Sequence, residues 1–262
     1  MAFDPLVYNM RNPFPNTLTE GIDLTYTTAN VVKKYTPGQY VYTWDPLWGY
    51  RIFKLVKNLS GATIAKGDLM SHVNAASVGT ITAGTTTSIT TSGLTANDFE
   101  FQMITISDDA GAAGAAPEGE SSLCIGNTTT VITLHPDYAF SAAVDASDTA
   151  SVVYINGVED AAANDERGLG IGSNGVAGVA FGAAADNEWF WILQRGWCTA
   201  KNTGALSAQR LIAGAALIED ATEGAQELEI GQCAVAQFAG TEASFASVFI
   251  DVFNTITISG TP

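Results

Sequence analysis

The stretch GYRIFKLVKNLSGATIAKGDLM, residues 49–70, contains the pattern on which the fold prediction depends. Its first half alternates aromatic or β-branched residues with polar ones, which is the period of a strand with one buried face. Turn-forming residues follow at Asn58, Ser60, Gly61, Gly67 and Asp68. The stretch therefore predicts a strand, a turn rich in small residues, and a second apolar segment.

The same order of features returns in the last third of the chain. The aromatic pattern NEWFWILQRGWCTA, residues 187–200, precedes a second small-residue turn, NTGALSA, residues 202–208. Three identities align the two turns, with Gly61, Ala62 and Ala65 matching Gly204, Ala205 and Ala208. A shared order of strand, turn and apolar segment predicts two related β units.

The intervening sequence also favours strands. FEFQMITIS (99–107), TTTVITLHP (128–136) and TASVVYINGV (149–158) show β patterns, and the threonine-rich segment 77–94 predicts short hairpins. Residues 209–226 are the one candidate helix, but Gly214 interrupts the pattern and the repeat favours a strand there. The predicted fold class is all-β, built from β-barrel or β-sandwich units.

Residues 1–46 differ in composition from the rest of the chain. Five of the eight prolines lie here, and each fixes φ and removes a backbone donor, which predicts an extended arm. A strand pattern begins within it at Tyr40. The domain prediction is therefore an arm over 1–46, a first β unit with inserted hairpins over 47–160, and a second β unit over 161–262.

Apolar side chains are interleaved among the prolines of the arm. An extended segment cannot bury them in a core of its own, so they must lie on the barrel of the same chain or on a neighbouring chain. The candidate partner-binding residues of the arm are Phe3, Leu6, Tyr8, Met10 and Phe14.

The net charge of the chain and the lengths of its apolar runs limit the classes of partner that the chain is expected to bind. Eleven Lys and Arg face 27 Asp and Glu, a formal net charge of −16, which disfavours binding to nucleic acid and to anionic membrane surfaces. No run of apolar residues reaches the length of a membrane helix, and no signal-peptide pattern opens the sequence. The three cysteines, Cys124, Cys198 and Cys233, form no Cys-x-x-Cys pair, which predicts free buried thiols and synthesis in a reducing cytoplasm.

Patterns typical of enzymes are weak. The motif G-x-G-x-x-G at 170–175 lacks the strand before it and the helix after it that a dinucleotide site requires. His72 and His135 have no ligand-type spacing. We predict no catalytic residues, no metal site and no cofactor, and hence a protein that is not an enzyme.

Three further patterns each have a structural and a functional interpretation. Asp108-Asp109 and the pair Asp145 and Asp148 fit turn acids better than a calcium loop, because the EF-hand spacing is absent. Two glycosylation sequons begin at Asn58 and Asn127, but no secretory signal accompanies them. The tryptophans are candidate core or oligomer-interface residues, with sugar stacking as the alternative: Trp44, Trp48, Trp189, Trp191 and Trp197.

Three segments resemble the head decoration, or cement, proteins of tailed bacteriophages. These are FKLVKNLSGATIAKGDLM (53–70), ISDDAGAAGAAPEGESSLCIGNTTTVITL (106–134) and VAGVAFGAAADNEWFWILQRGWCTAKNTGALSA (176–208), within a likeness that spans roughly residues 50–240. The resemblance implies a small β-barrel or β-sandwich protein that is not an enzyme. It also implies a homotrimer that binds the major capsid protein on the outer surface of the virion head. The alternative is a receptor- or carbohydrate-binding virion module associated with a fibre or tail.

Overall fold

The computed structural model of the protein describes residues 37–45, 49–108, 115–160, 176–201, 210–213, 217–219, 232–236 and 245–252. Among these residues the regular structure consists of strands and one short 3-10 helix, η1 (Pro136–Tyr138), so the predicted all-β class is confirmed. Segment 209–226, the candidate helix, contributes the strands β14 (Arg210–Ala213) and β15 (Leu217–Glu219), as the repeat argument favoured.

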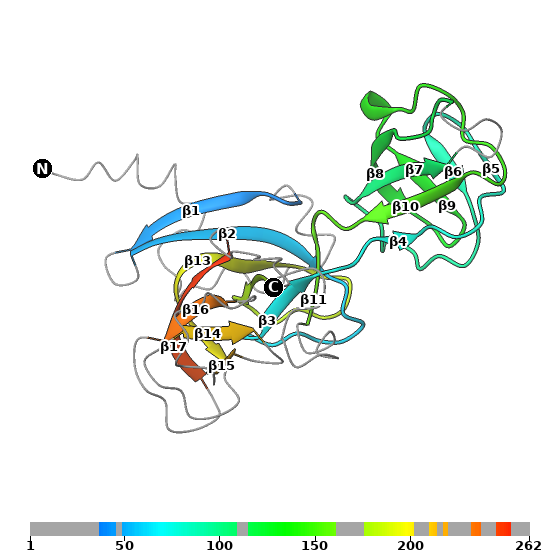
Figure 1. The fold of residues 1–262 in the computed structure, drawn as a ribbon. Helices are drawn as coiled ribbons and strands as arrows, with labels where there is room; N and C mark the ends of the chain where they lie inside the picture. The colour runs from blue at the N-terminus through cyan, green and yellow to red at the C-terminus, as the bar shows by residue number, and fades with distance from the viewer. Residues whose placement is uncertain are drawn as a thin grey trace, which may run out of the picture. The chain divides into compact units, whose positions relative to one another are not determined.

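The chain divides into two compact units, at positions other than those the sequence predicted. Unit 1 combines Met1–His72 with Val158–Pro262, and unit 2 is the continuous stretch Val73–Gly157 (Figure 1). His72 and Val158 are directly paired across two strands of unit 1. Unit 2 is therefore an insertion that leaves and re-enters unit 1 at adjacent residues, which is why the interruption does not break the sheet.

The predicted extent of the arm also changes. Residues 40–45, assigned to the arm by the 1–46 boundary, form strand β1, which pairs with β2 along its length. The boundary is wrong there because the alternation YVYTW, rather than the nearby prolines, decides the conformation. The preceding residues 1–36 lie outside the described part of the chain.

Unit 1 contains a closed barrel. In the sheet order β2, β11, β3, β12 and β13 are successive neighbours, and β2 also pairs with β13, which closes a ring of five strands. The remaining strands extend the sheet at β2 on one side and at β13 on the other. The strands are β1 (Tyr40–Asp45), β2 (Gly49–Asn58), β3 (Leu69–His72), β11 (Gly157–Asp160), β12 (Val176–Ala180), β13 (Trp189–Lys201), β14, β15, β16 (Gln232–Ala236) and β17 (Phe245–Asp251).

The two longest strands of unit 1, β2 and β13, form the centre of its sheet. They are antiparallel partners from Lys57 opposite Trp189 to Ile52 opposite Arg195, whereas the rest of β13 pairs with β17. The two aromatic strands of the predicted repeat are thus neighbours in one sheet rather than parts of separate units. The second small-residue turn, 202–208, lies outside the described residues.

The structure nevertheless contains a local two-fold repeat in unit 1, between the loops Gly61–Asp68 and Phe181–Glu188. Ile64 and Ala184 exchange backbone hydrogen bonds, at 2.9 Å from Ile64 N to Ala184 O and 3.1 Å in return. Each loop connects a strand to the next, β2 to β3 and β12 to β13, and the strands pair crosswise as β2 with β13 and β12 with β3. The two loops therefore meet at equivalent residues, and each strand pairs with a strand from the other half of the repeat.

Side chains at equivalent positions hold the two loops in the same shape. The amide of Ala65 donates to Asp68 Oδ2 at 2.6 Å, and the amide of Ala185 donates to Glu188 Oε2 at 2.9 Å. The residue before each acid has a positive φ, 87° at Gly67 and 65° at Asn187, a conformation that glycine and asparagine tolerate best. The spacing Ala-x-Gly/Asn-acid is the sequence signal of this repeat.

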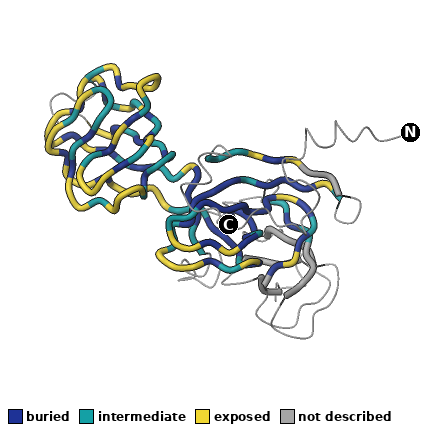
Figure 2. The backbone as a smooth tube through the Cα atoms, turned by 180° about the vertical axis from the view of Figure 1, so that it is seen from behind, coloured by how far each residue is buried: buried dark blue, intermediate teal, exposed yellow. Residues whose placement is uncertain are grey.

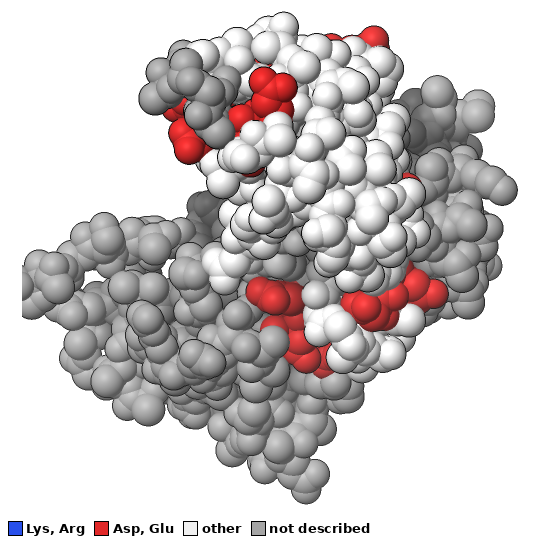
Figure 3. Space-filling view, turned by 90° about the vertical axis from the view of Figure 1, so that its right-hand side faces the viewer, with Lys and Arg blue, Asp and Glu red and all other residues white. Residues whose placement is uncertain are grey.

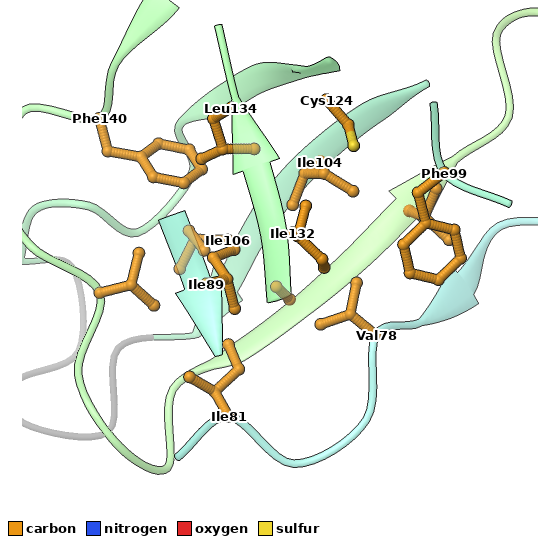
Figure 4. Close-up of a cluster of buried hydrophobic side chains, with 13 residues drawn as sticks. Val78, Ile81, Ile89, Phe99, Ile104, Ile106, Cys124, Ile132, Leu134 and Phe140 are labelled. Carbon is orange, nitrogen blue, oxygen red and sulfur yellow. The ribbon is translucent and has the colours of Figure 1, made fainter. Parts of the chain in front are cut away.

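Unit 2 is an antiparallel sheet in the order β4-β10-β7-β8-β9-β6-β5. Its apolar side chains, among them Ile89, Ile104, Ile106 and Ile132, converge on one cluster of thirteen buried residues (Figure 4). Buried positions follow the strands of each unit (Figure 2). The strands of unit 2 are β4 (Ala76–Ser77), β5 (Ala83–Gly84), β6 (Ser88–Thr90), β7 (Met103–Asp108), β8 (Ser121–Asn127), β9 (Val131–Leu134) and β10 (Thr149–Val153).

Candidate interaction surface

Three exposed tyrosines gather on strands β1 and β2 of unit 1. Tyr40, Tyr42 and Tyr50 keep 42%, 53% and 51% of their surface exposed, and they are half of the six exposed large hydrophobic residues among the described side chains. The other three, Ile125, Tyr138 and Ile155, come from three different segments of unit 2. We call Tyr40, Tyr42 and Tyr50 the tyrosine row.

Strand alternation explains why the row is exposed. Successive side chains of a strand point to opposite faces, so Tyr40 and Tyr42 share one face while Val41, which is buried, faces the core. The pairing of β1 with β2 brings Tyr50 within reach, and the rings of Tyr42 and Tyr50 lie with centroids 6.2 Å apart and planes tilted by 32°. The row therefore places three exposed aromatic rings on two paired strands, and two of these rings are in contact.

A cation borders the row. Lys54 is the register partner of Tyr40, and its Nζ lies 5.5 Å from the centroid of the Tyr40 ring. Burial lowers the pKa of Lys54, while burial first and then the Tyr42 hydroxyl raise the pKa of Tyr40. The Tyr40 phenol therefore stays protonated at neutral pH, and the row combines ring faces with O–H and N–H donors.

The row lies at the end of a sheet. β1 is the first strand in the sheet order, and no strand among the described residues pairs with its outer edge. An edge strand offers backbone donors and acceptors to an extended partner chain. Tyrosine is also enriched at protein interfaces, since it buries a large ring and keeps a polar tip. The surface has the properties of a protein-binding site.

Unit 2 has a different surface. Between Val73 and Gly157 the sequence contains no Lys or Arg. The face shown in Figure 3 accordingly carries red carboxylates without a blue side chain. The acids of this unit are Asp98, Glu100, Asp108, Asp109, Glu118, Glu120, Asp137, Asp145 and Asp148.

The sequence-predicted tryptophans separate into different environments. Trp189 and Trp191 are buried, at 1% and 2% exposure, so their rings belong to the core and cannot stack on a ligand. Trp197 is half-buried against Phe249, with ring centroids 5.3 Å apart. The backbone of Trp44 pairs with Tyr50 in the β1–β2 ladder. Trp48 lies outside the described residues.

The predicted partner-binding residues of the arm, Phe3, Leu6, Tyr8, Met10 and Phe14, also lie outside the described residues, as does the glycine motif at 170–175. The tyrosine row itself was not singled out in the sequence. Its signal is the spacing of Tyr40 and Tyr42 on one face of a strand, followed by Tyr50 in the next strand. Distinguishing that pattern from a buried aromatic strand requires knowing that β1 is at an edge.

Asp148 and His135, which the sequence analysis weighed as possible ligands, have local hydrogen-bond partners. Asp148 accepts a hydrogen bond from the Asp145 amide at 2.8 Å, which closes a turn. His135 accepts one from the Asp137 amide at 3.2 Å and caps η1. The described residues contain no group of three His, Cys, Asp or Glu side chains that could hold a metal ion. Asp109 lies outside them.

The two sequon asparagines tie loops to strands. Asn58 is fully buried, and its Nδ2 donates to the carbonyls of Ala62 at 2.7 Å and Ala184 at 3.1 Å. Asn127 is also buried, and its Nδ2 donates to Thr95 O at 2.7 Å while its Oδ1 accepts from Phe99 N at 2.9 Å. Both amides are thus occupied inside the fold rather than presented at the surface.

Two of the thiols follow the prediction, since Cys124 and Cys198 are free and buried. Cys233 lies in β16, where the description covers the backbone. The described part of the chain contains no helix with the length and apolar character needed to cross a bilayer.

Comparisons of the chain with family models, with curated proteins and with solved structures gave no match.

Proposed function

We propose that this chain is a structural protein of a virus particle, a decoration protein that binds the major capsid protein on the outer surface of the head and associates with copies of itself, as a homotrimer. The observation that carries the proposal is the tyrosine row on an edge strand pair. Segments 53–70, 106–134 and 176–208, which resemble phage head decoration proteins, direct this general binding capacity toward a capsid.

The fold supports an assembly function in two ways. A closed five-stranded barrel is a rigid support. Tyr50 lies on its strand β2, and β1, which carries Tyr40 and Tyr42, pairs with β2 along its length. Phe190 and Ile192 of β13 belong to a buried cluster that draws residues from all five strands of that barrel. Binding energy at such a surface concentrates in a few aromatic residues, so the row would supply most of the affinity.

The test is binding to heads of the virus that encodes the chain, after the resident copies are stripped. Wild-type protein should saturate the heads at a copy number in the hundreds in co-sedimentation. Replacing Tyr42 and Tyr50 together by Ala should weaken binding roughly 30-fold or more, the effect of losing an aromatic hot spot. Tyr138→Ala, which changes an exposed tyrosine of unit 2, is the matched control. Saturation at only a few copies, or no binding, would overturn the proposal.

A receptor- or carbohydrate-binding module is the second candidate, and the structure changes where it would bind. Trp189 and Trp191 are buried, so sugar stacking would have to use the tyrosine row. The polar tips of Tyr40 and Lys54 beside exposed ring faces favour such a use. A glycan array probed with wild-type protein and with the Tyr42/Tyr50 double variant tests it, since specific binding must disappear in the variant.

A further inference from the structure

We infer that Asn156-Gly157, at the exit of the chain from unit 2, is a site of spontaneous deamidation, and that hydrogen bonds to Phe101 and Gln102 suppress this modification in the folded unit. Gly157 is the last residue of unit 2 and the first residue of β11. The inference goes beyond the proposed function, since it concerns a chemical change of the chain itself, whatever the chain binds.

The dipeptide Asn156-Gly157 contains both reacting groups of the modification. The backbone nitrogen of Gly157 is the nucleophile, and Cγ of the Asn156 side chain is the electrophile. A bond forms between these two atoms, the bond from Cγ to Nδ2 breaks, and the nitrogen takes up the Gly157 proton and leaves as ammonia. Water then opens the resulting succinimide ring at either carbonyl, which gives aspartate or isoaspartate without oxidation or reduction. Glycine favours the reaction because it has no Cβ to hinder the nitrogen.

Two consecutive residues hold Asn156 in the folded unit. The backbone amide of Asn156 donates to Gln102 Oε1 at 2.9 Å, and Nδ2 of Asn156 donates to Phe101 O at 3.0 Å. Gln102 is fully buried, and Asn156 keeps 9% of its surface exposed. We call Phe101, Gln102 and Asn156 the exit clamp.

The exit clamp opposes the reaction at the atom that must leave. Nδ2 of Asn156 is the donor to Phe101 O and also the leaving nitrogen, so deamidation requires this hydrogen bond to break. Gly157 is buried like Asn156, which limits the access of the water that accepts its proton and later opens the ring. Deamidation therefore depends on local opening of the exit clamp.

The backbone on the other side of the exit clamp depends on the same contact. Phe101 has a φ of 58°, in the left-handed region that bulky residues rarely adopt. Its amide donates to Cys124 O at 2.8 Å, and its carbonyl accepts from Asn156 Nδ2, so hydrogen bonds on both sides of Phe101 maintain this conformation.

The product of deamidation cannot restore the exit clamp. An aspartate at position 156 presents carboxylate oxygens, which are acceptors only, to the carbonyl oxygen of Phe101. It also places a negative charge at a position that is nine-tenths buried. Isoaspartate in addition lengthens the backbone by one methylene between β10 and β11. The modification therefore records each opening that leads to reaction as a permanent change at the exit of unit 2.

The rate of conversion tests the inference on the full-length chain. Wild-type protein is incubated in mildly alkaline buffer, either folded or in urea above its unfolding transitions, and mass spectrometry of a digest measures the conversion of Asn156. Asn174-Gly175, the second Asn-Gly of the chain, is the internal reference for the buffer. Asn156 should convert at least about tenfold more slowly in the folded protein than in urea.

A variant of the exit clamp tests the role of Gln102. Gln102→Met removes the acceptor of the Asn156 amide at similar side-chain volume, and Asn156 should then convert roughly threefold faster or more in the folded protein. The matched control is Gln194→Met, which replaces a buried glutamine of unit 1 whose Nε2 donates to Ala177 O. This control should leave the conversion of Asn156 unchanged.

The effect of the product is measured with Asn156→Asp. This variant should lower the melting temperature of unit 2 by about 4 °C or more. Asn97→Asp makes the same change of charge at an exposed asparagine of unit 2 and should lower it by less than half as much.

Several outcomes would overturn the inference. These are equal conversion of Asn156 in folded and unfolded protein, no conversion in urea, a folded Gln102→Met variant with the wild-type rate, or equal melting of Asn156→Asp and Asn97→Asp. If Gln102→Met does not fold, amide hydrogen exchange at Asn156 of the wild-type protein decides. Slow exchange supports the exit clamp, and exchange as fast as in the unfolded chain overturns it.

Discussion

Unit 1 and unit 2 are both antiparallel β structures, but they differ in how many stretches of the sequence form them. Unit 2 is one stretch of sequence, and its core forms from residues within Val73–Gly157. Unit 1 is assembled from two stretches, and its central pair β2 and β13 joins residues that are far apart in the sequence. The comparison shows that a second unit can be inserted into a barrel when the insertion begins and ends beside two residues that pair with each other in the barrel sheet. Here these residues are His72 and Val158.

The units also differ in the charges they bury. Arg51 and Lys57 of β2 are buried in unit 1, whereas unit 2 contains no Lys or Arg and buries the acid Asp148. The guanidinium of Arg51 lies over the Phe53 ring, with Cζ 5.5 Å from the centroid. Unit 1 thus uses long amphipathic side chains as part of its packing, while the buried cluster of unit 2 consists mainly of aliphatic residues together with Phe99 and Phe140.

The largest expected effect comes from separating the units. Replacing residues 73–157 by Asn-Gly should connect β3 to β11 by a tight hairpin turn, because His72 and Val158 already face each other. The shortened protein should lose one of two unfolding transitions and keep the other. An isolated 73–157 fragment should show the missing transition. Differential scanning calorimetry checks both, and an unfolded product in either case would show that the units depend on each other.

The next effect is expected at Gly196 of β13, whose backbone lies against Tyr50 and Arg51 of β2. A Cβ on Gly196, whose φ is 120°, would lie 2.8 Å from the carbonyl oxygen of Tyr50 and 2.4 Å from Cγ of Arg51. Gly196→Val should therefore destabilise unit 1 by roughly 2–6 kcal/mol, from overpacking and backbone strain together.

The matched control for Gly196 is in unit 2. Gly126→Val places a side chain where nothing lies within 4 Å, in the strand β8. Its effect should stay within about 1 kcal/mol. Urea unfolding measures both variants. Equal losses would mean that the close contact of Gly196 with Tyr50 and Arg51 does not limit the stability of unit 1.

A smaller effect is expected from the two buried asparagines. Asn58→Ala should lower the stability of unit 1, and Asn127→Ala that of unit 2, each by roughly 1–3 kcal/mol, because buried backbone groups lose their partners. Each substitution should shift only the calorimetric transition of its own unit. A shift of the other transition would show that the loops couple the units.

The smallest effect concerns acid stability. Burial first, and then the charge of Lys54, lower the pKa of His72 below 6.5, so the unfolded chain binds this proton more readily than unit 1 does. The contribution of His72 is complete above about pH 6.5 and declines as the pH falls through and below that value. Melting of unit 1 between pH 8 and pH 5 should show this decline, and His72→Gln should flatten it.

In unit 2 the group with a shifted pKa is Glu120, and it titrates at a lower pH than His72 of unit 1. Hydrogen bonds from the hydroxyl and the amide of Ser141 lower the pKa of Glu120 below 4.5. Its contribution is present above about pH 4.5 and is lost as the pH falls further, and it is weak because the carboxylate is in contact with solvent. Glu120→Gln should change the melting of unit 2 only below that pH. A change at neutral pH would point to a structural effect of the substitution.

Several elements were predictable because their signals are local. The alternation in YRIFKLVKN predicts β2, and NEWFWILQRGWCTA predicts β13, since one buried face requires a period of two. The Ala-x-Gly/Asn-acid spacing is also local, although the repeat was first assigned to a different turn. The exposure of the tyrosine row could not be predicted, because an aromatic strand has the same pattern at an edge and in a centre.

By itself the amino-acid sequence determined the all-β class, the positions of the main strands, the anionic character of the chain and the absence of Lys and Arg from residues 67–166. These properties follow from residue types and short spacings. Only the tertiary structure decided that β2 pairs with β13, that residues 73–157 form an inserted unit, and that Trp191 is buried while Tyr42 is exposed. Strand pairing joins residues more than a hundred positions apart, and no short-range pattern specifies which strands become neighbours or which strand remains at the edge.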